Sequence, residues 1–327
     1  MKQERQQPNL SILTNTIPSK KHWFLKTARF LKRVLLGKRP LVDRYGGHPA
    51  VTRSILEGLR HIGAIFNYNP SSESDLSSIL FVLSDLDALR QGVYLKKRGL
   101  IRQLFAGPNL LIDPSDEKEL LSSPLIDGFI TPSGWVRDFY IHEIPGISKK
   151  CHVWPAGVNI KEWTPDQNFQ KTKTALIYDK LDHGQPIHEY QEFLREQGWK
   201  TSIIRYGNYK KERYLQMLRQ SQLALFFSPS ESQGIALLEC WSTDVPTLVW
   251  DRGWAFLKEK NKTIPASSAP YLNPDLGCFF SDVGSFKEVF LQWQSDRASF
   301  YPRQWVSTHM SDEVCAKNLL KIFGLAT

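Results

Sequence analysis

Short apolar runs alternate with helical patterns along most of this chain. Each run is short enough for a buried strand, and each ends at polar or turn-forming residues. In the first half, the predicted strands are residues 10–16, 64–68, 79–83, 103–106 and 128–131. Apolar residues at helical spacing predict helices over residues 51–59, 87–97 and 135–142. This alternation predicts a doubly wound α/β domain built on a parallel sheet.

The pattern restarts in the second half, after a polar stretch from Trp163 to Thr174 that has the composition of a linker. The predicted strands there are residues 175–178, 201–205, 223–227, 247–250 and 278–280. The predicted helices are residues 188–197, 210–221, 234–241, 286–294 and 314–323. We therefore expect a second α/β domain, with ligands at the carboxyl ends of its strands.

Two acidic residues interrupt the apolar unit at residues 223–250, which has the pattern strand, helix, strand. Glu231 lies in the loop before the predicted helix, and Glu239 lies within that helix. Gly234 removes a side chain at the helix N-terminus, where free N–H groups and the helix dipole favour an anion. A diphosphate fits this place, with a carboxylate on either side to accept hydrogen bonds from hydroxyls.

A structural alternative exists for the same two acids: Glu231 favours the helix start, and Glu239 lies on a solvated stripe. The predicted helix is apolar nearly all round, so it has little solvated surface. A buried carboxylate needs a partner. These two points favour the ligand site.

Other candidates follow from their positions at strand ends. Lys180 and Tyr206 end predicted strands of the second half. Asp85, Asn109 and Ser133 each come just after a predicted strand of the first half, where an ordinary loop residue is the alternative. All five are candidates to face the cleft, because ligands of such sheets bind at the carboxyl ends of strands.

A glycine pair, Gly46 and Gly47, belongs to a segment at residues 45–49 that we predict as a flexible loop before the helix at 51–59. Glycine at such a loop permits close approach of the backbone to a phosphate or a sugar. By itself the pair is a weak signal.

Residues 19–38 form a basic amphipathic pattern. Apolar Phe24, Ala28, Leu31 and Leu35 recur at helical spacing. The basic residues between them are Lys20, Lys21, Lys26, Arg29, Lys32 and Arg33. This composition is typical of helices that lie on anionic membranes, and the alternative is a surface helix that packs on its own domain.

Composition adds a charge imbalance to this picture. The chain has 42 Lys and Arg against 33 Asp and Glu, a formal net charge of +9, which indicates a nucleotide, a nucleic acid or an acidic membrane surface as partner. The four cysteines are far apart in the sequence, which favours free thiols and a cytoplasmic protein. No apolar run is long enough to span a membrane, and no group of residues has metal-ligand spacing, so we expect no metal.

Taken together, the two α/β domains and the paired glutamates resemble the GT-B glycosyltransferases. The stretch ESQGIALLE at 231–239 resembles the signature of the large retaining family 4, two glutamates separated by seven residues. PAGVNIKEWTP at 155–165 resembles the family's Asn-Gly-Val-Asp approach to the linker, and ITPSGWVRDFY at 130–140 resembles its Val-Pro-Ser element. The resemblance covers roughly residues 44–325.

This resemblance implies an α/β, GT-B fold, in which two Rossmann-like, doubly wound domains face a central cleft. The expected boundaries are residues 1–163 for an acceptor-side domain and 164–310 for a domain that binds the nucleotide sugar. The C-terminal helix, at about 311–327, is expected to cross back onto the first domain.

The resemblance also implies a retaining glycosyltransferase of the hexosyltransferase type, without a cofactor or a metal. Its donor would be a UDP- or GDP-sugar and its acceptor a saccharide or a lipid-linked saccharide. Glu231 is then expected to contact hydroxyls of the donor sugar, Glu239 to hold the ribose and Lys180 to meet the diphosphate. Ser232, Gln233, Gly234, Ile235 and Tyr206 complete the expected donor site, and Gly46, Gly47 and Asn109 form the expected acceptor and phosphate loop.

The chain departs from the family pattern at several places. Gln233 stands where the family usually has an aromatic residue. An arginine often accompanies the phosphate-binding lysine, and here only the distant Arg205 is a candidate. The histidine that commonly follows an N-domain strand has no counterpart near Ser84 or Asn109.

Other functions share parts of this pattern. A GT-B-type hydrolase, epimerase or phosphorylase would use the same carboxylates, although two turns of helix separate them more than the roughly 5 to 9.5 Å typical of hydrolases. A non-catalytic protein that binds sugar or nucleotide is a further alternative. A nucleic-acid binder is disfavoured, because no aromatic RNA motif or zinc pattern accompanies the positive charge.

Overall fold

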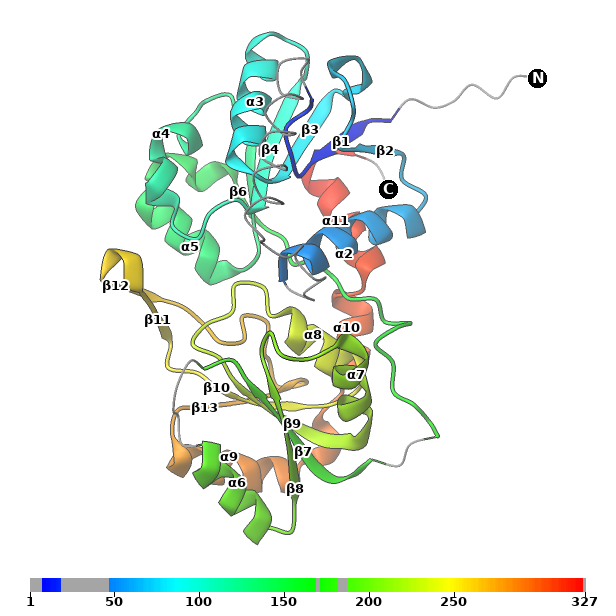
Figure 1. Cartoon of the computed structure of the whole chain (residues 1–327), viewed down its shortest axis with the longest axis vertical. Helices are drawn as coiled ribbons and strands as arrows, with labels where there is room; N and C mark the ends of the chain where they lie inside the picture. The colour runs from blue at the N-terminus through cyan, green and yellow to red at the C-terminus, as the bar shows by residue number, and fades with distance from the viewer. Residues whose placement is uncertain (1–7, 19–46, 169–170, 182–186, 326–327) are drawn as a thin grey trace, which may run out of the picture.

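The computed structural model describes residues 8–18, 47–168, 171–181 and 187–325. It consists of two α/β domains stacked one above the other (Figure 1). The predicted basic helix at 19–38 lies outside the described residues, and so does Gly46. The predicted fold class is confirmed, because both large sheets are parallel and carry helices on their faces.

The N-terminal domain is built on a six-stranded parallel sheet of order β2-β1-β3-β4-β5-β6. In chain order its strands are β1 (Leu10–Leu13), β2 (Phe66–Tyr68), β3 (Ile79–Ser84), β4 (Gln103–Asn109), β5 (Gly128–Thr131) and β6 (Cys151–Val153). Its helices are α2 (Gly47–His61), α3 (Leu86–Lys97), α4 (Lys118–Leu121) and α5 (Gly134–Glu143). The central strands are buried on both faces, which explains why their sequences are apolar without alternation.

The C-terminal domain repeats the architecture with a five-stranded parallel sheet of order β13-β10-β9-β7-β8. Its strands are β7 (Thr172–Asp179), β8 (Lys200–Arg205), β9 (Ser221–Phe227), β10 (Thr247–Trp250) and β13 (Gly277–Phe280). Its helices are α6 (Ile187–Glu196), α7 (Lys211–Gln220), α8 (Ile235–Ser242), α9 (Val283–Ser295) and α10 (Pro302–His309). Aromatic side chains fill the space between the sheet and α6 and α9, among them Tyr190, Phe286 and Trp293.

The sequence pattern missed a β-hairpin made of β11 (Trp254–Leu257) and β12 (Lys262–Pro265). This hairpin belongs by sequence to the C-terminal domain, but Ala255 and Ile264 are buried in the core of the N-terminal domain. Lys262 forms an ion pair with Glu143 of α5. The apolar and polar positions of this hairpin alternate over only a few residues, and lysines interrupt them, so the sequence does not identify its strands. The buried side chains of the hairpin pack on the other domain, which no local pattern indicates. Strand β6 and helix α10 were also not predicted.

Helix α11 (Asp312–Ile322) leaves the C-terminal domain and packs against α2 of the N-terminal domain, where the red and blue helices lie side by side (Figure 1). The helices approach closely at Gly58, where a Cβ atom would lie 2.3 Å from the carbonyl oxygen of Asp312. The returning chain also meets the linker, since Val158 and Ser311 form a parallel bridge. Both connections between the domains therefore lie together.

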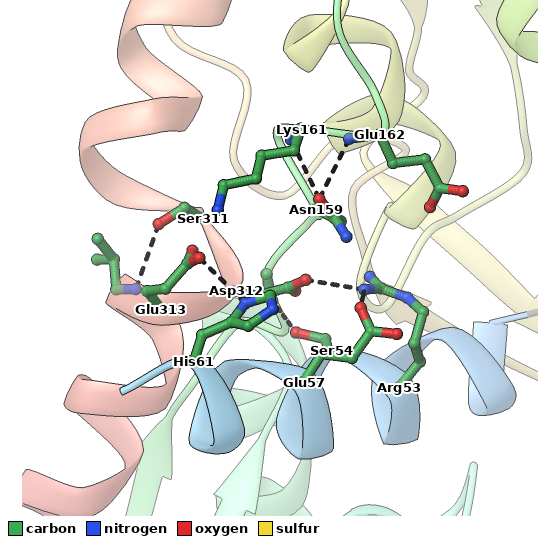
Figure 2. Close-up of polar contacts among 12 residues, drawn as sticks. Arg53, Ser54, Glu57, His61, Asn159, Lys161, Glu162, Ser311, Asp312 and Glu313 are labelled. Carbon is green, nitrogen blue, oxygen red and sulfur yellow. Dashed lines mark hydrogen bonds and ion pairs between the residues drawn. The ribbon is translucent and has the colours of Figure 1, made fainter. Parts of the chain in front are cut away.

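A polar cluster fixes this junction, as Figure 2 shows. Arg53 of α2 donates hydrogen bonds of 2.8 Å to Asp312 and to Glu57. The next residue of α2, Ser54, accepts a 2.8 Å hydrogen bond from the backbone N–H of Gly157 in the linker. Asp312 is only 1 % exposed, so the Arg53 charge compensates a buried carboxylate. Helix α2 therefore contacts both segments that connect the domains, the linker at Gly157 and the start of α11 at Asp312.

Candidate functional site

A cavity of about 210 Å³ lies where the carboxyl ends of β7, β8 and β9 face the start of α2. The loop between β9 and α8 and the first turns of α8 contribute residues 231–236 and Glu239. The ends of β7 and β8 and the loop after β8 contribute Tyr178, Lys180, Tyr206 and Tyr209. The N-terminal domain contributes His48 and Ala50. The cavity therefore occupies the position expected for a ligand of a doubly wound sheet, between two domains.

The first turn of α8 faces this cavity. Gly234 precedes the helix with φ of 71°, in the left-handed region that favours glycine. The first backbone N–H groups of any α-helix have no partner within the helix. Because Ile235 and Ala236 line the cavity, this end of α8 can bind an anion placed there.

Lys180 and Glu231 form the charged pair of the site. Nζ of Lys180 lies 2.8 Å from Oε1 of Glu231, and the same oxygen accepts a 2.9 Å hydrogen bond from Oγ of Ser228. The Lys180 ammonium also lies over the Tyr206 ring, 4.7 Å from its centroid. A ligand phosphate can share this ammonium with Glu231, because a lysine has three N–H donors.

The backbone of Glu231 is fixed by groups on both sides of the cleft. Its N–H donates to the carbonyl of Ser267 at 2.8 Å. Its carbonyl accepts a 3.0 Å hydrogen bond from the indole of Trp135, which belongs to α5 of the N-terminal domain. The Glu231 position is therefore coupled to the placement of the two domains.

Glu239 lies one turn into α8 and is 1 % exposed in the wall of the cavity. Two tyrosines stand nearby, and the hydroxyls of Tyr178 and Tyr209 are 3.1 Å apart. Burial raises the pKa of both phenols, and the carboxylates of Glu231 and Glu239 raise the pKa of each further. Both hydroxyls therefore stay protonated at neutral pH and can donate hydrogen bonds to a ligand or to each other.

The start of α2 corrects the prediction of a flexible loop at 45–49. Helix α2 begins at Gly47, so Gly47, His48 and Pro49 are helical. Proline is compatible with this place because the first N–H groups of a helix need no intrahelical acceptor. His48 and Ala50 line the cavity.

The N-domain strand ends do not join the cavity. Asn109 ends β4 and is not among the cavity's lining residues, so its place in an acceptor and phosphate loop stays a prediction. Asp85 caps α3, where its side chain accepts from the N–H groups of Asp87 and Ala88. Ser133 is the N-cap residue of α5 and is buried.

In the C-terminal domain, Arg205 pairs with Asp179 at 3.8 Å and is not among the cavity's lining residues.

Sequence reasoning identified Glu231, Ser232, Gln233, Gly234, Ile235, Glu239, Lys180 and Tyr206, and all of them line this one cavity. It missed His48, Tyr178 and Tyr209. Tyr178 ends a predicted strand just before Lys180, which was a usable signal. His48 becomes a neighbour of the C-terminal domain only through the packing of α2, so no local pattern marked it.

Neither a metal site nor a membrane span was found in the described part of the chain. Among residues 8–18, 47–168, 171–181 and 187–325, no three His, Cys, Asp or Glu side chains gather as metal ligands would. Within the same residues, every helix is too short or too polar to cross a bilayer. All four cysteines are free thiols.

Comparison with known proteins finds similarity at the level of structure. No family model and no curated protein matches the sequence. The chain resembles sucrose-phosphate synthase from Thermosynechococcus elongatus, with a TM-score of 0.58 and 11% identity over 98% of both chains. It also resembles Anabaena HepE in complex with UDP, with a TM-score of 0.56 and 10% identity over 96% of this chain and 99% of that chain.

A third similar structure is the lipopolysaccharide outer core galactosyltransferase WaaB, with a TM-score of 0.55 and 12% identity over 96% of this chain and 99% of that chain. All three similarities extend over both domains, so they include the cleft between the domains. This chain has the GT-B fold, and its structural neighbours include glycosyltransferases.

Proposed function

We propose that this protein is a retaining glycosyltransferase that uses a nucleotide-sugar donor. The observation that carries the proposal is the convergence of Lys180, Glu231, Glu239 and the α8 N-terminus on one interdomain cavity. The cavity thus offers cationic and N–H donors for a diphosphate beside carboxylates for hydroxyl groups. The Anabaena HepE structure, which holds UDP in the same fold, supports a nucleotide as ligand.

In this proposal the nucleotide lies along α8. Its ribose hydroxyls donate to Glu239, and its diphosphate receives hydrogen bonds from the first turn of α8 and from Lys180. The sugar then lies near Glu231, at the other end of the motif. The positions of the two acids support this order, since Glu231 lies in the loop before Gly234 and Glu239 lies one turn inside α8.

The proposed chemistry is displacement of the nucleoside diphosphate from the sugar C1 by an acceptor hydroxyl. As the C1–O bond to phosphate breaks, its electron pair goes to the phosphate oxygen, and positive charge develops on the sugar ring. Lys180 and the α8 N–H groups stabilise the growing phosphate charge because they are already oriented toward it. In a front-face reaction the departing phosphate takes the acceptor proton, so no separate base and no metal are needed.

The acceptor is proposed to be a saccharide or a lipid-linked saccharide that approaches from the N-terminal domain. The basic pattern at 19–38 supports a lipid-linked acceptor and a peripheral position on the inner face of a membrane, because basic residues each contribute about 1 kcal/mol near an anionic surface. Flotation with anionic liposomes should fall at high salt, and it should fall when Lys26, Arg29, Lys32 and Arg33 are changed to Glu. Equal flotation on neutral liposomes contradicts the electrostatic part of this proposal.

The donor can be identified before any acceptor is known. Thermal-shift measurements with a panel of UDP- and GDP-sugars should show one that raises the melting temperature, since ligand at one hundred times Kd adds about 2.7 kcal/mol of stability. Incubation with that donor and candidate acceptors then separates transfer from hydrolysis, which yields free sugar. A panel with no stabilising nucleotide or nucleotide sugar contradicts the proposed function.

A further inference from the structure

Gln233 lies at the junction of the cavity and the interdomain linker. It follows Glu231 by two residues and precedes Gly234 at the start of α8. The residue lines the cavity and is 6 % exposed. Its Nε2 donates to the backbone carbonyl of Ala156 at 3.4 Å, which attaches a residue of the C-terminal domain to the linker.

This contact decides the orientation of the Gln233 amide. A backbone carbonyl only accepts hydrogen bonds, so the atom that faces Ala156 must be the N–H₂ group. The amide oxygen is therefore held on the opposite side of the group. The linker residue that follows is Gly157, whose N–H donates to Ser54 of α2, so the amide rests on a backbone segment that is itself fixed.

The Gln233 amide oxygen is a buried acceptor. Within residues 8–18, 47–168, 171–181 and 187–325, no group donates a hydrogen bond to Oε1. Leaving a buried acceptor unsatisfied lowers stability, and such groups in native proteins are few and call for an explanation, such as a bound water, ion or ligand. Apolar side chains of similar size would fill the same place without this cost, so the oxygen points to a ligand that donates a hydrogen bond.

We propose that Gln233 determines which donor sugar the protein accepts, through a hydrogen bond from a sugar hydroxyl or amide N–H to Oε1. This inference rests on the proposed function. The sugar, rather than the nucleotide, is the proposed partner because Gln233 belongs to the loop that carries Glu231, whereas Glu239 lies inside α8. A site that presents a buried acceptor rejects sugars lacking the matching donor, because the acceptor then stays unsatisfied.

The test compares binding of the free nucleoside diphosphate with binding of the nucleotide sugar identified by the thermal-shift panel. Isothermal titration is performed on the parent protein and on Gln233→Met, which has similar size without the acceptor. We expect the affinity for the diphosphate to change less than twofold and that for the nucleotide sugar to fall at least about tenfold. Gln216→Met, an exposed substitution of the same chemistry on α7, should change neither affinity.

A second variant, Gln233→Asn, keeps the amide but retracts it by one methylene, and it gives the same comparison where Gln233→Met does not fold. Equal losses for diphosphate and nucleotide sugar mean that Gln233 only shapes the loop, and that overturns the inference. Unchanged affinities in both variants overturn it as well. If the parent itself binds neither ligand, the proposed function fails, and the inference fails with it. A parent that binds both ligands while the variants show no selective loss overturns the role of Gln233 alone.

Discussion

Nζ of Lys180 lies 2.8 Å from Oε1 of Glu231, so a cation and a carboxylate of the cavity are paired. Both side chains are only partly exposed, and the Tyr206 ring covers the ammonium. The pair holds each group in place, while the remaining N–H bonds of the ammonium stay available for an anion.

The first prediction follows from this pairing. Lys180→Met should lower kcat by roughly 100-fold, the size of effect seen when one oriented donor to a developing charge is removed. Affinity for a nucleoside without phosphate should be unchanged, because Lys180 is proposed to contact only the diphosphate. Transfer kinetics and titration with the nucleoside measure the two effects. Equal loss of nucleoside binding indicates a collapsed site and contradicts the assigned role.

The junction of the domains gives a prediction about stability. Arg53→Met leaves the buried Asp312 carboxylate uncompensated and should lower the free energy of unfolding by about 3–5 kcal/mol. The double variant Arg53→Met with Asp312→Leu should recover most of this loss, because no buried charge remains. Chemical denaturation at pH 7 measures both. A double variant no more stable than Arg53→Met contradicts this account of the junction.

The same variant has a defined pH dependence. Burial raises the pKa of Asp312 above its ordinary value, and the Arg53 charge opposes that rise. Removing Arg53 therefore raises the folded-state pKa further, so the folded variant binds a proton that the unfolded chain does not. Acidification from pH 7 through this raised pKa should stabilise Arg53→Met relative to the parent. Parallel pH profiles for the parent and the variant contradict the prediction.

Local sequence patterns were sufficient to predict the part of the candidate site that lies between β9 and α8 and within α8. Glu231, Gly234 and Glu239 belong to one strand-loop-helix unit, so their proximity is fixed by backbone geometry over a few residues. Lys180 could be predicted because strand ends meet at one edge of a parallel sheet. The same reasoning placed the central strands of both sheets, whose apolar runs are buried on both faces, but it missed the edge strand β6.

Interdomain contacts could not be predicted in this way. His48 reaches the cavity because α11 holds α2 in place, and Trp135 contacts Glu231 across the cleft. The β11–β12 hairpin completes its buried face with side chains of the other domain, so its own sequence carries only a weak strand pattern. Such contacts join residues that are far apart in the chain, and periodicity carries no information about them.

A fourth prediction concerns metal dependence. Transfer should survive exhaustive chelation of enzyme and substrates together, because Lys180 and the α8 N-terminus are proposed to stabilise the leaving diphosphate directly. Turnover is measured with and without EDTA, and then after adding back one divalent ion at a time. Loss of turnover that a single divalent ion restores contradicts the proposed mechanism.

The most direct test of the account is titration of UDP and GDP onto the parent, Glu239→Gln and Glu231→Gln, followed by transfer assays on all three. We expect one nucleotide to bind the parent and to bind Glu239→Gln at least about tenfold more weakly, since a hydrogen bond to a charged group contributes about 1.5–3 kcal/mol. Glu231→Gln should bind that nucleotide within about twofold of the parent but transfer sugar far more slowly. Binding and transfer that are the same in all three proteins contradict the assignment of this cavity as the nucleotide-sugar site.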